Sequence, residues 1–140
     1  MTPTPPQAAE QAAQCLYDAD RASQALGMRL IEVAPGFARV TMSVRADMTN
    51  GHGCCHGGLI FALADSAFAF ACNSHGEPTV AAGAMIDFLS PVQVGEQLTA
   101  SAREQWRGSR TGLYDIVVTA ADQKIVALFR GRSHTLKRKG

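Results

Sequence analysis

The sequence predicts an α+β fold in which one long central helix is wrapped by an antiparallel sheet. The first observation is that residues 59–72 are apolar nearly all round, as in a helix buried on every side. The second is that the chain after Pro78 alternates between apolar and polar residues, as strands do. The third is the length of 140 residues, from which we expect residues 1–140 to form a single domain.

The N-terminal region is predicted to be a short lead-in followed by a surface helix. Residues 1–6 contain three prolines, and we expect a flexible segment there. Residues 7–26 are rich in alanine, and Gly27 is a natural stop for a helix. The expected buried face consists of residues at helical spacing, which are Cys15, Ala19, Ala22 and Leu26.

The remaining elements are predicted to be strands around the central helix. Pro35 and Gly36 indicate a turn between two paired strands, 30–33 and 40–44. Four more strands are expected at 79–89, 97–107, 113–121 and 124–136. We expect them to follow one another as an antiparallel meander, with a basic tail at 137–140.

The composition excludes several classes of protein. Apolar residues make up 46% and charged residues 18%, as in globular chains, and the net charge of +1 gives no reason to expect nucleic-acid binding. No apolar run reaches the ~20 residues that span a bilayer, so we expect no membrane partner. Four cysteines without a secretory signal are best explained as free thiols, and we expect a cytoplasmic protein.

Asp65 stands in the middle of the apolar helix. Its neighbours at three, four and seven positions include no cation, and burying an unpaired carboxylate costs free energy. The carboxylate could bond a loop and serve structure, or it could act as a base or nucleophile in an apolar cleft. Its position alone leaves both interpretations open.

The start of the helix carries Gly57 and Gly58, where backbone N–H groups have no helical acceptor. Free amides at a positive helix end suit a carbonyl oxygen that gains negative charge. The two glycines could also simply relieve crowding. Gly57 and Asp65 are eight residues apart, which is ~12 Å along a helix, so one substrate could reach both only if they came from two subunits.

A metal or redox site is the alternative interpretation of the residues before the helix, which include His52, Cys54, Cys55 and His56. Two ligand pairs at zinc spacing are missing, and no C-x-x-C is present. We therefore predict no metal and no cofactor.

The stretch from Asn50 to Ala69, which reads N-G-H-x-x-C-H-G-G-x-x-F-x-L-A-D-x-A-F-A, resembles the hotdog-fold acyl-CoA thioesterases. Within the 4-hydroxybenzoyl-CoA thioesterase superfamily it is most similar to the phenylacetate-degradation, or PaaI-type, branch. The segments at 87–91, 112–115 and 127–134 are also similar to that branch. The resemblance implies the hotdog fold, a homodimer as the smallest active unit and a dimer of dimers.

The resemblance also implies roles for particular residues. Asp65 would be the general base or nucleophile of thioester hydrolysis, and the Gly57 amide would polarise the carbonyl. Asn50 and His56 would position the water or the carbonyl, and Ser66 would lie near the water. Some relatives carry a serine early in the strand after the helix, whereas residues 80–83 here read V-A-A-G.

The implied substrates are aromatic acyl-CoA thioesters, with coenzyme A as part of the substrate. Phenylacetyl-CoA or a ring-hydroxylated relative would suit an aromatic pocket that includes Phe61. Gly58, Arg110 and Arg130 are further candidates for substrate contact, the arginines through phosphate. Three alternatives stay open: aliphatic acyl-CoA preference, a hotdog dehydratase, and a non-catalytic acyl-CoA binding or sensing module.

Overall fold

The structure is a computed structural model that describes residues 2–136. That part of the chain contains the helices α1 (Pro5–Ala19), α2 (Arg21–Ala25) and α3 (Gly57–Cys72). The six strands are β1 (Arg29–Ala34), β2 (Phe37–Ser43), β3 (Thr79–Phe88), β4 (Gln97–Arg107), β5 (Thr111–Thr119) and β6 (Ile125–Thr135). Two short 3-10 turns lie at Ala46–Met48 and Ala121–Gln123.

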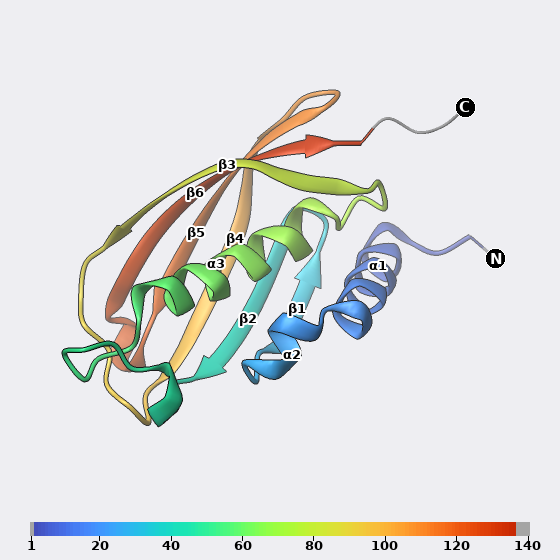
Figure 1. Ribbon diagram of the computed structural model, residues 1–140. Coiled ribbons are helices and arrows are strands. Elements are labelled where there is room, and N and C mark those ends of the chain that lie inside the picture. Colours follow the sequence, from blue (N-terminus) through green and yellow to red (C-terminus); the bar gives the residue numbers. More distant parts are fainter. Residues whose placement is uncertain (1, 137–140) are drawn as a thin grey trace.

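The predicted architecture is confirmed, because the sheet curves around α3 and packs against one side of it (Figure 1). Alanines at 64, 67 and 71 are fully buried and let the sheet approach the helix closely. Gly131 on β6 serves the same purpose, since a Cβ there would lie 2.5 Å from the Phe68 ring. Within residues 2–136, no helix is long and apolar enough to cross a membrane.

The sheet is antiparallel with the strand order β1-β2-β4-β5-β6-β3. The meander prediction is therefore right for β4, β5 and β6 but wrong for β3, which pairs with β6 at the far edge. Strands that follow one another in sequence are often, but not always, adjacent in the sheet. Here β3 forms one edge of the sheet, and β5 and β6 lie between it and β4, the next strand in sequence. Among the described strands β3 pairs only with β6, and its side chains are mostly exposed.

The N-terminal helix differs from the prediction in two ways. It is broken at Asp20, which ends α1 and caps α2, so 7–26 is not one helix. The expected buried face is also wrong, because Ala9 and Ala13 are buried whereas Cys15 and Ala22 are exposed. Cys15 lies within α1 two residues after Ala13, which is about 200° around the helix and therefore on the opposite face. Ala22 lies beyond the break, in α2, where Ser23 is the buried residue.

The end of the expected flexible lead-in at 1–6 belongs to the first helix instead. Thr4 forms a capping box with Gln7, and Pro5 begins α1. Proline fits the first helical turn because its missing N–H has no acceptor there in any case. The predicted basic tail at 137–140 lies outside the described residues.

Candidate active site

The N-terminal end of α3 presents one unsatisfied amide. His56 is the N-cap, and its Nδ1 accepts a hydrogen bond from Gly58 N at 2.9 Å. The His56 carbonyl accepts from the amides of residues 59 and 60. Within residues 2–136, the Gly57 N–H therefore has no acceptor, as the helix start predicted. Because Nδ1 accepts, a neutral His56 ring carries its proton on Nε2, which is then a hydrogen-bond donor.

Asn50 closes the loop that precedes this helix. Its Oδ1 accepts from His52 N at 2.9 Å and from Cys54 N at 3.1 Å. Its backbone N–H donates to the Cys54 carbonyl at 2.7 Å. The side-chain oxygen is thus used within the loop, and the Nδ2 group remains as the donor that Asn50 can offer to a ligand.

A cavity of about 430 Å³ lies against this loop and the first turn of α3, and we call it the amide cavity. Asn50, Cys54 and Gly57 line one side of it, and residues 88–91 line the other. The Phe88 ring is so close to Gly57 that a Cβ at residue 57 would lie 3.2 Å from it. Glycine at this position therefore leaves room for a ligand oxygen beside the amide.

A second cavity of about 370 Å³ contains the carboxylate, and we call it the Asp65 cavity. The middle and end of α3, the junction of α1 and α2, and the beginning of β3 form its walls. Its lining residues are Leu16, Ala19, Asp20, Asp65, Phe68, Ala69, Cys72, Asn73, Thr79, Val80 and Ala81. The volume falls in the range of sites that hold small ligands, and the lining is mainly apolar.

Asp65 is half-buried, and within residues 2–136 its carboxylate makes no hydrogen bond or ion pair. Burial raises its pKa above the ordinary 3.8, and the nearby charge of Asp20 raises it further. The loop-bonding interpretation of Asp65 therefore finds no partner among residues 2–136. A carboxylate with raised proton affinity, open to a cavity and unpaired, is suited to remove a proton from water.

The other predicted site residues are placed in different surroundings. Ser66 Oγ lies 2.8 Å from Ser23 Oγ, and the Phe61 ring packs edge-on against Phe129 at 5.1 Å. Arg110 is exposed in the turn between β4 and β5. Arg130 is held by Asp115 through bonds of 2.7 and 2.9 Å. Asp115 is one of the partly buried alternate residues of β5, and Arg130 is one of the exposed residues of β6.

The structure thus separates the predicted residues into two sites on one chain. Asn50 and Gly57 line the amide cavity, and His56 caps the helix beside Gly57 without lining the cavity itself. Asp65 lies in its own cavity, and it is ~12 Å further along the helix axis than Gly57. Sequence reasoning missed Asp20, which lines the Asp65 cavity. An acidic residue three positions before Ser23 is an N-cap signal that could have revealed the break in the helix.

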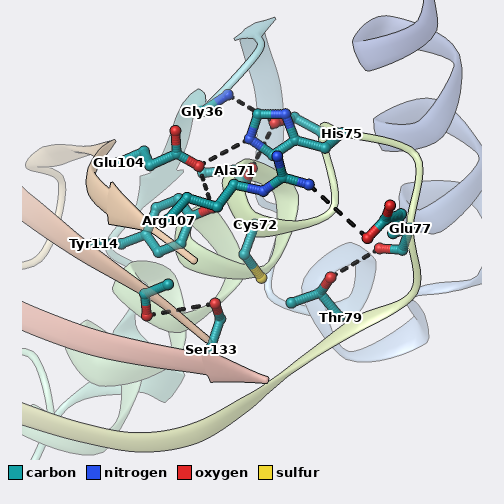
Figure 2. Close-up of polar contacts among 12 residues, drawn as sticks. Gly36, Ala71, Cys72, His75, Glu77, Thr79, Glu104, Arg107, Tyr114 and Ser133 are labelled. Carbon is teal, nitrogen blue, oxygen red and sulfur yellow. Dashed lines mark hydrogen bonds and ion pairs between the residues drawn. The ribbon is translucent and has the colours of Figure 1, made fainter. Parts of the chain in front are cut away.

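A separate polar cluster lies beyond the C-terminal end of α3 (Figure 2). Tyr114 donates a hydrogen bond to Glu104 Oε1 at 2.8 Å, and His75 Nε2 lies 2.8 Å from the same oxygen. Burial disfavours ionisation of Glu104, but the hydrogen bonds from His75 and Tyr114 and the charges of His75 and Arg107 outweigh it and lower the pKa. This carboxylate is fully partnered, so we assign it to stability.

No group of three or more His, Cys, Asp or Glu side chains is placed to hold a metal ion anywhere in the described range, 2–136. The cysteines in that range are free thiols. Burial raises the pKa of Cys72, which lines the Asp65 cavity, to about 12. A thiol with that pKa is a poor nucleophile at neutral pH.

Comparison with known proteins identifies the class. The family model described as Thioesterase superfamily matches residues 52–127, and the chain belongs to that superfamily. Acyl-coenzyme A thioesterase PaaI of Escherichia coli K12 is 51% identical over 126 residues, which cover 90% of each chain. The resemblance to the PaaI-type hotdog thioesterases is thereby confirmed, and the protein is an enzyme of that type.

Solved structures agree with this assignment. The E. coli PaaI protein from the phenylacetic acid degradation operon matches with a TM-score of 0.94 at 48% identity, covering 96% of this chain and 97% of that one. A mutant of the phenylacetic acid degradation protein PaaI from Thermus thermophilus matches with a TM-score of 0.81 at 42% identity. That match covers 84% of this chain and all of the other.

Proposed function

We propose that this protein hydrolyses aromatic acyl-CoA thioesters, such as phenylacetyl-CoA or a ring-hydroxylated relative, to the free acid and coenzyme A. The observation that carries the proposal is the half-buried, unpaired carboxylate of Asp65 in a mainly apolar cavity. The name of the E. coli relative supports an acyl-CoA substrate, and the phenylacetic acid operon of its structure supports the aromatic class.

Each site in the proposed enzyme is built from two copies of the chain. Strand β3 is an edge strand, and its neighbourhood exposes apolar side chains, including Val80 at 46%, Phe88 at 52% and Leu89 at 54%. Such an edge favours pairing with another strand. A second β3, antiparallel and centred on Ala84, would place residue 80 of one copy across from residue 88 of the other.

This pairing joins the two cavities. The beginning of β3 lines the Asp65 cavity, and the residues from Phe88 onward line the amide cavity. A twofold axis between the strands therefore brings the Asp65 cavity of one copy toward the amide cavity of its partner, twice over. The ~12 Å between Gly57 and Asp65 within one copy is then no obstacle.

The proposed reaction uses Asp65 as a general base. The carboxylate removes a proton from water, and the water oxygen attacks the thioester carbonyl carbon. The Gly57 N–H of the other copy donates to the carbonyl oxygen as it gains negative charge. The carbon–sulfur bond then breaks, the thiolate of coenzyme A leaves, and the proton held on Asp65 returns to the products. Direct attack by Asp65 to give an anhydride is the alternative route.

The acyl group occupies the Asp65 cavity in this proposal. Leu16, Phe68 and Val80 give that cavity apolar and aromatic walls, which suit a phenyl ring. For the phosphates of coenzyme A, Arg110 remains a candidate because its side chain is exposed. Arg130 would first have to leave Asp115, which makes it the weaker candidate.

Thioester cleavage across a panel of acyl-CoA substrates tests the proposed activity. The panel contains phenylacetyl-, hydroxyphenylacetyl-, benzoyl-, and short and long aliphatic thioesters, and it compares wild type with Asp65→Asn. We expect the aryl-acetyl compounds to be cleaved preferentially and the variant to bind without turnover. A preference for aliphatic thioesters would keep the mechanism and remove the aromatic substrate. Tight binding without turnover by wild type would favour the sensing module.

A mixing experiment tests the two-chain site. Asp65→Asn removes the base, and Gly57→Val obstructs the amide beside Phe88. Each variant alone should be inactive, but in a mixed dimer one of the two sites has both of its parts intact. Random exchange of equal amounts should restore about a quarter of wild-type activity. No recovery after confirmed subunit exchange would show that one chain contains the whole site.

A further inference from the structure

The break between α1 and α2 places a second carboxylate beside the catalytic one. Asp20 lines the same cavity as Asp65, together with Leu16 and Ala19 from the end of α1. Its backbone N–H donates to the Tyr17 carbonyl at 3.0 Å and ends α1, and its carbonyl accepts from Gln24 N at 3.2 Å within α2. Asp20 is therefore both the C-cap of α1 and the N-cap of α2.

A chain of hydrogen bonds connects Asp20 to the residue next to Asp65. Asp20 Oδ1 accepts from Ser23 N at 3.0 Å, and Oδ2 accepts from Ser23 Oγ at 2.6 Å. Ser23 is buried at 2% exposure, and its Oγ also lies 2.8 Å from Ser66 Oγ on α3. The junction of the two short helices is thereby fastened to the catalytic helix at the turn that carries Asp65.

The number of available hydroxyl protons determines which group donates in each hydrogen bond between Asp20, Ser23 and Ser66. An ionised carboxylate only accepts, so the single hydroxyl proton of Ser23 is committed to Asp20. Ser66 must then be the donor in its contact with Ser23. The Ser66 proton is thus directed away from α3 toward Ser23, and Ser66 can offer only lone pairs to other groups.

We propose that Asp20 is a positioning residue for the Asp65 carboxylate, acting through the Ser23–Ser66 hydrogen bonds and through its own negative charge. The inference rests on the proposed function of Asp65 as a base. Two carboxylates in one mainly apolar cavity disfavour each other's ionisation, and a base with higher proton affinity takes a proton from water more readily. The charge of Asp20 acts in this direction on Asp65, second only to burial.

Few other ionisable groups face Asp65. Cys72 is the third titratable group in the lining, and the β3 residues there, Thr79 to Ala81, carry none. On the neighbouring elements, the Tyr17 hydroxyl donates to Met28 O, Arg21 of α2 is exposed, and Tyr114 of β5 is bonded to Glu104. In the proposed dimer, His52 and His56 of the other copy would be further ionisable groups near Asp65. Among residues 2–136, Asp20 is the other carboxylate in the lining of this cavity, and a single substitution can neutralise it.

The test is a titration of Asp65 that needs no turnover. The ¹³Cγ resonance of Asp65, identified by its loss in Asp65→Asn, is followed against pH in wild type, Asp20→Asn and Asp20→Ser. Both substitutes remain good helix caps, so α2 should persist. We expect the midpoint to fall by about half a pH unit or more in both variants, and the acid limb of the pH–rate profile to shift equally.

Two control variants separate charge from structure. Asp18→Asn removes an exposed carboxylate two residues away, and it should leave the Asp65 midpoint unchanged. Ser23→Ala keeps the charge of Asp20 but cuts the bridge to Ser66, so it should lower kcat with a smaller shift of the midpoint. An unchanged Asp65 midpoint in both Asp20 variants would overturn the proposal, whether or not Tm falls. Absence of thioesterase activity in wild type would instead refute the proposed function, independently of the titration.

Discussion

Two partly buried carboxylates beside α3 have opposite surroundings. Glu104 receives a hydrogen bond from Tyr114, contacts His75 and feels Arg107, and its pKa is lowered. Asp65 has no such partner within residues 2–136, and burial and Asp20 raise its pKa. Both residues are partly buried. The difference teaches that partners, not burial, distinguish a carboxylate that stabilises the fold from one that is available for chemistry.

The largest expected effect belongs to Asp65. Replacing Asp65 with Asn should lower kcat for thioester hydrolysis by about 10²–10⁴-fold, because general-base catalysis contributes that much. Steady-state kinetics of the purified variant would measure it, with Tm and dimer content as controls for folding. Residual activity within a few-fold of wild type would remove Asp65 from the mechanism and make the two carboxylates alike.

The second prediction concerns Glu104. Replacing it with Gln should lower the free energy of unfolding by about 1–3 kcal/mol, because hydrogen bonds to a charged acceptor are lost in a partly buried site. The activity should stay within about twofold of wild type, since Glu104 lies outside both cavities. Urea unfolding measures the change in the free energy of unfolding, and the kinetic assay measures the change in activity. A large loss of kcat at unchanged stability would contradict the assignment of this cluster to stability.

The third prediction concerns space beside the Gly57 amide. The N–H remains in Gly57→Ala, but the added methyl would lie 3.2 Å from the Phe88 ring and narrow the amide cavity. We expect kcat/KM to fall by about tenfold, corresponding to about 1.4 kcal/mol of transition-state stabilisation. A matched change is Gly51→Ala, where a Cβ meets nothing within 4 Å and kinetics should be unaffected.

The smallest effect is the pH dependence of stability, which should have opposite signs at the two sites. The stabilisation from Glu104 is present above its unfolded pKa, near 4.5, and is lost as the pH falls through its lowered folded pKa. For Asp65 the folded pKa is raised, so wild type loses stability relative to Asp65→Asn as the pH rises above 3.8. Urea unfolding of both variants from pH 3 to 8, compared with wild type, measures the two slopes. Slopes of the same sign would show that partners do not separate these carboxylates.

The sequence revealed the central features of the fold and site through local patterns. The apolar run 59–72 contains one carboxylate and starts with two glycines, and both features keep their predicted places in α3. The position of β3 was not predictable in this way, because pairing with β6 is a long-range choice that no local pattern encodes. The position of Asp20 at a helix break was not predicted, because the sequence on both sides of it is rich in alanine and favours one continuous helix.

The arginines illustrate a second limit. Charge marks Arg110 and Arg130 as candidates for phosphate contact, but only the three-dimensional register of β5 and β6 pairs Arg130 with Asp115. Whether a cation is already neutralised depends on cross-strand neighbours, which are about 15 residues apart along this chain. Phosphate contacts by either arginine remain predictions.

If each site is built from two chains, as proposed above, the separation of Gly57 from Asp65 along α3 links catalytic activity to protein concentration. In the proposed dimer, each chain contributes its Gly57 amide to one active site and its Asp65 carboxylate to the other. An isolated chain therefore contains no complete active site. Dilution below the dissociation constant of the dimer would then lower the specific activity without unfolding anything. Such an enzyme is inactive at low concentration and becomes active only when its concentration is high enough for the chains to dimerise.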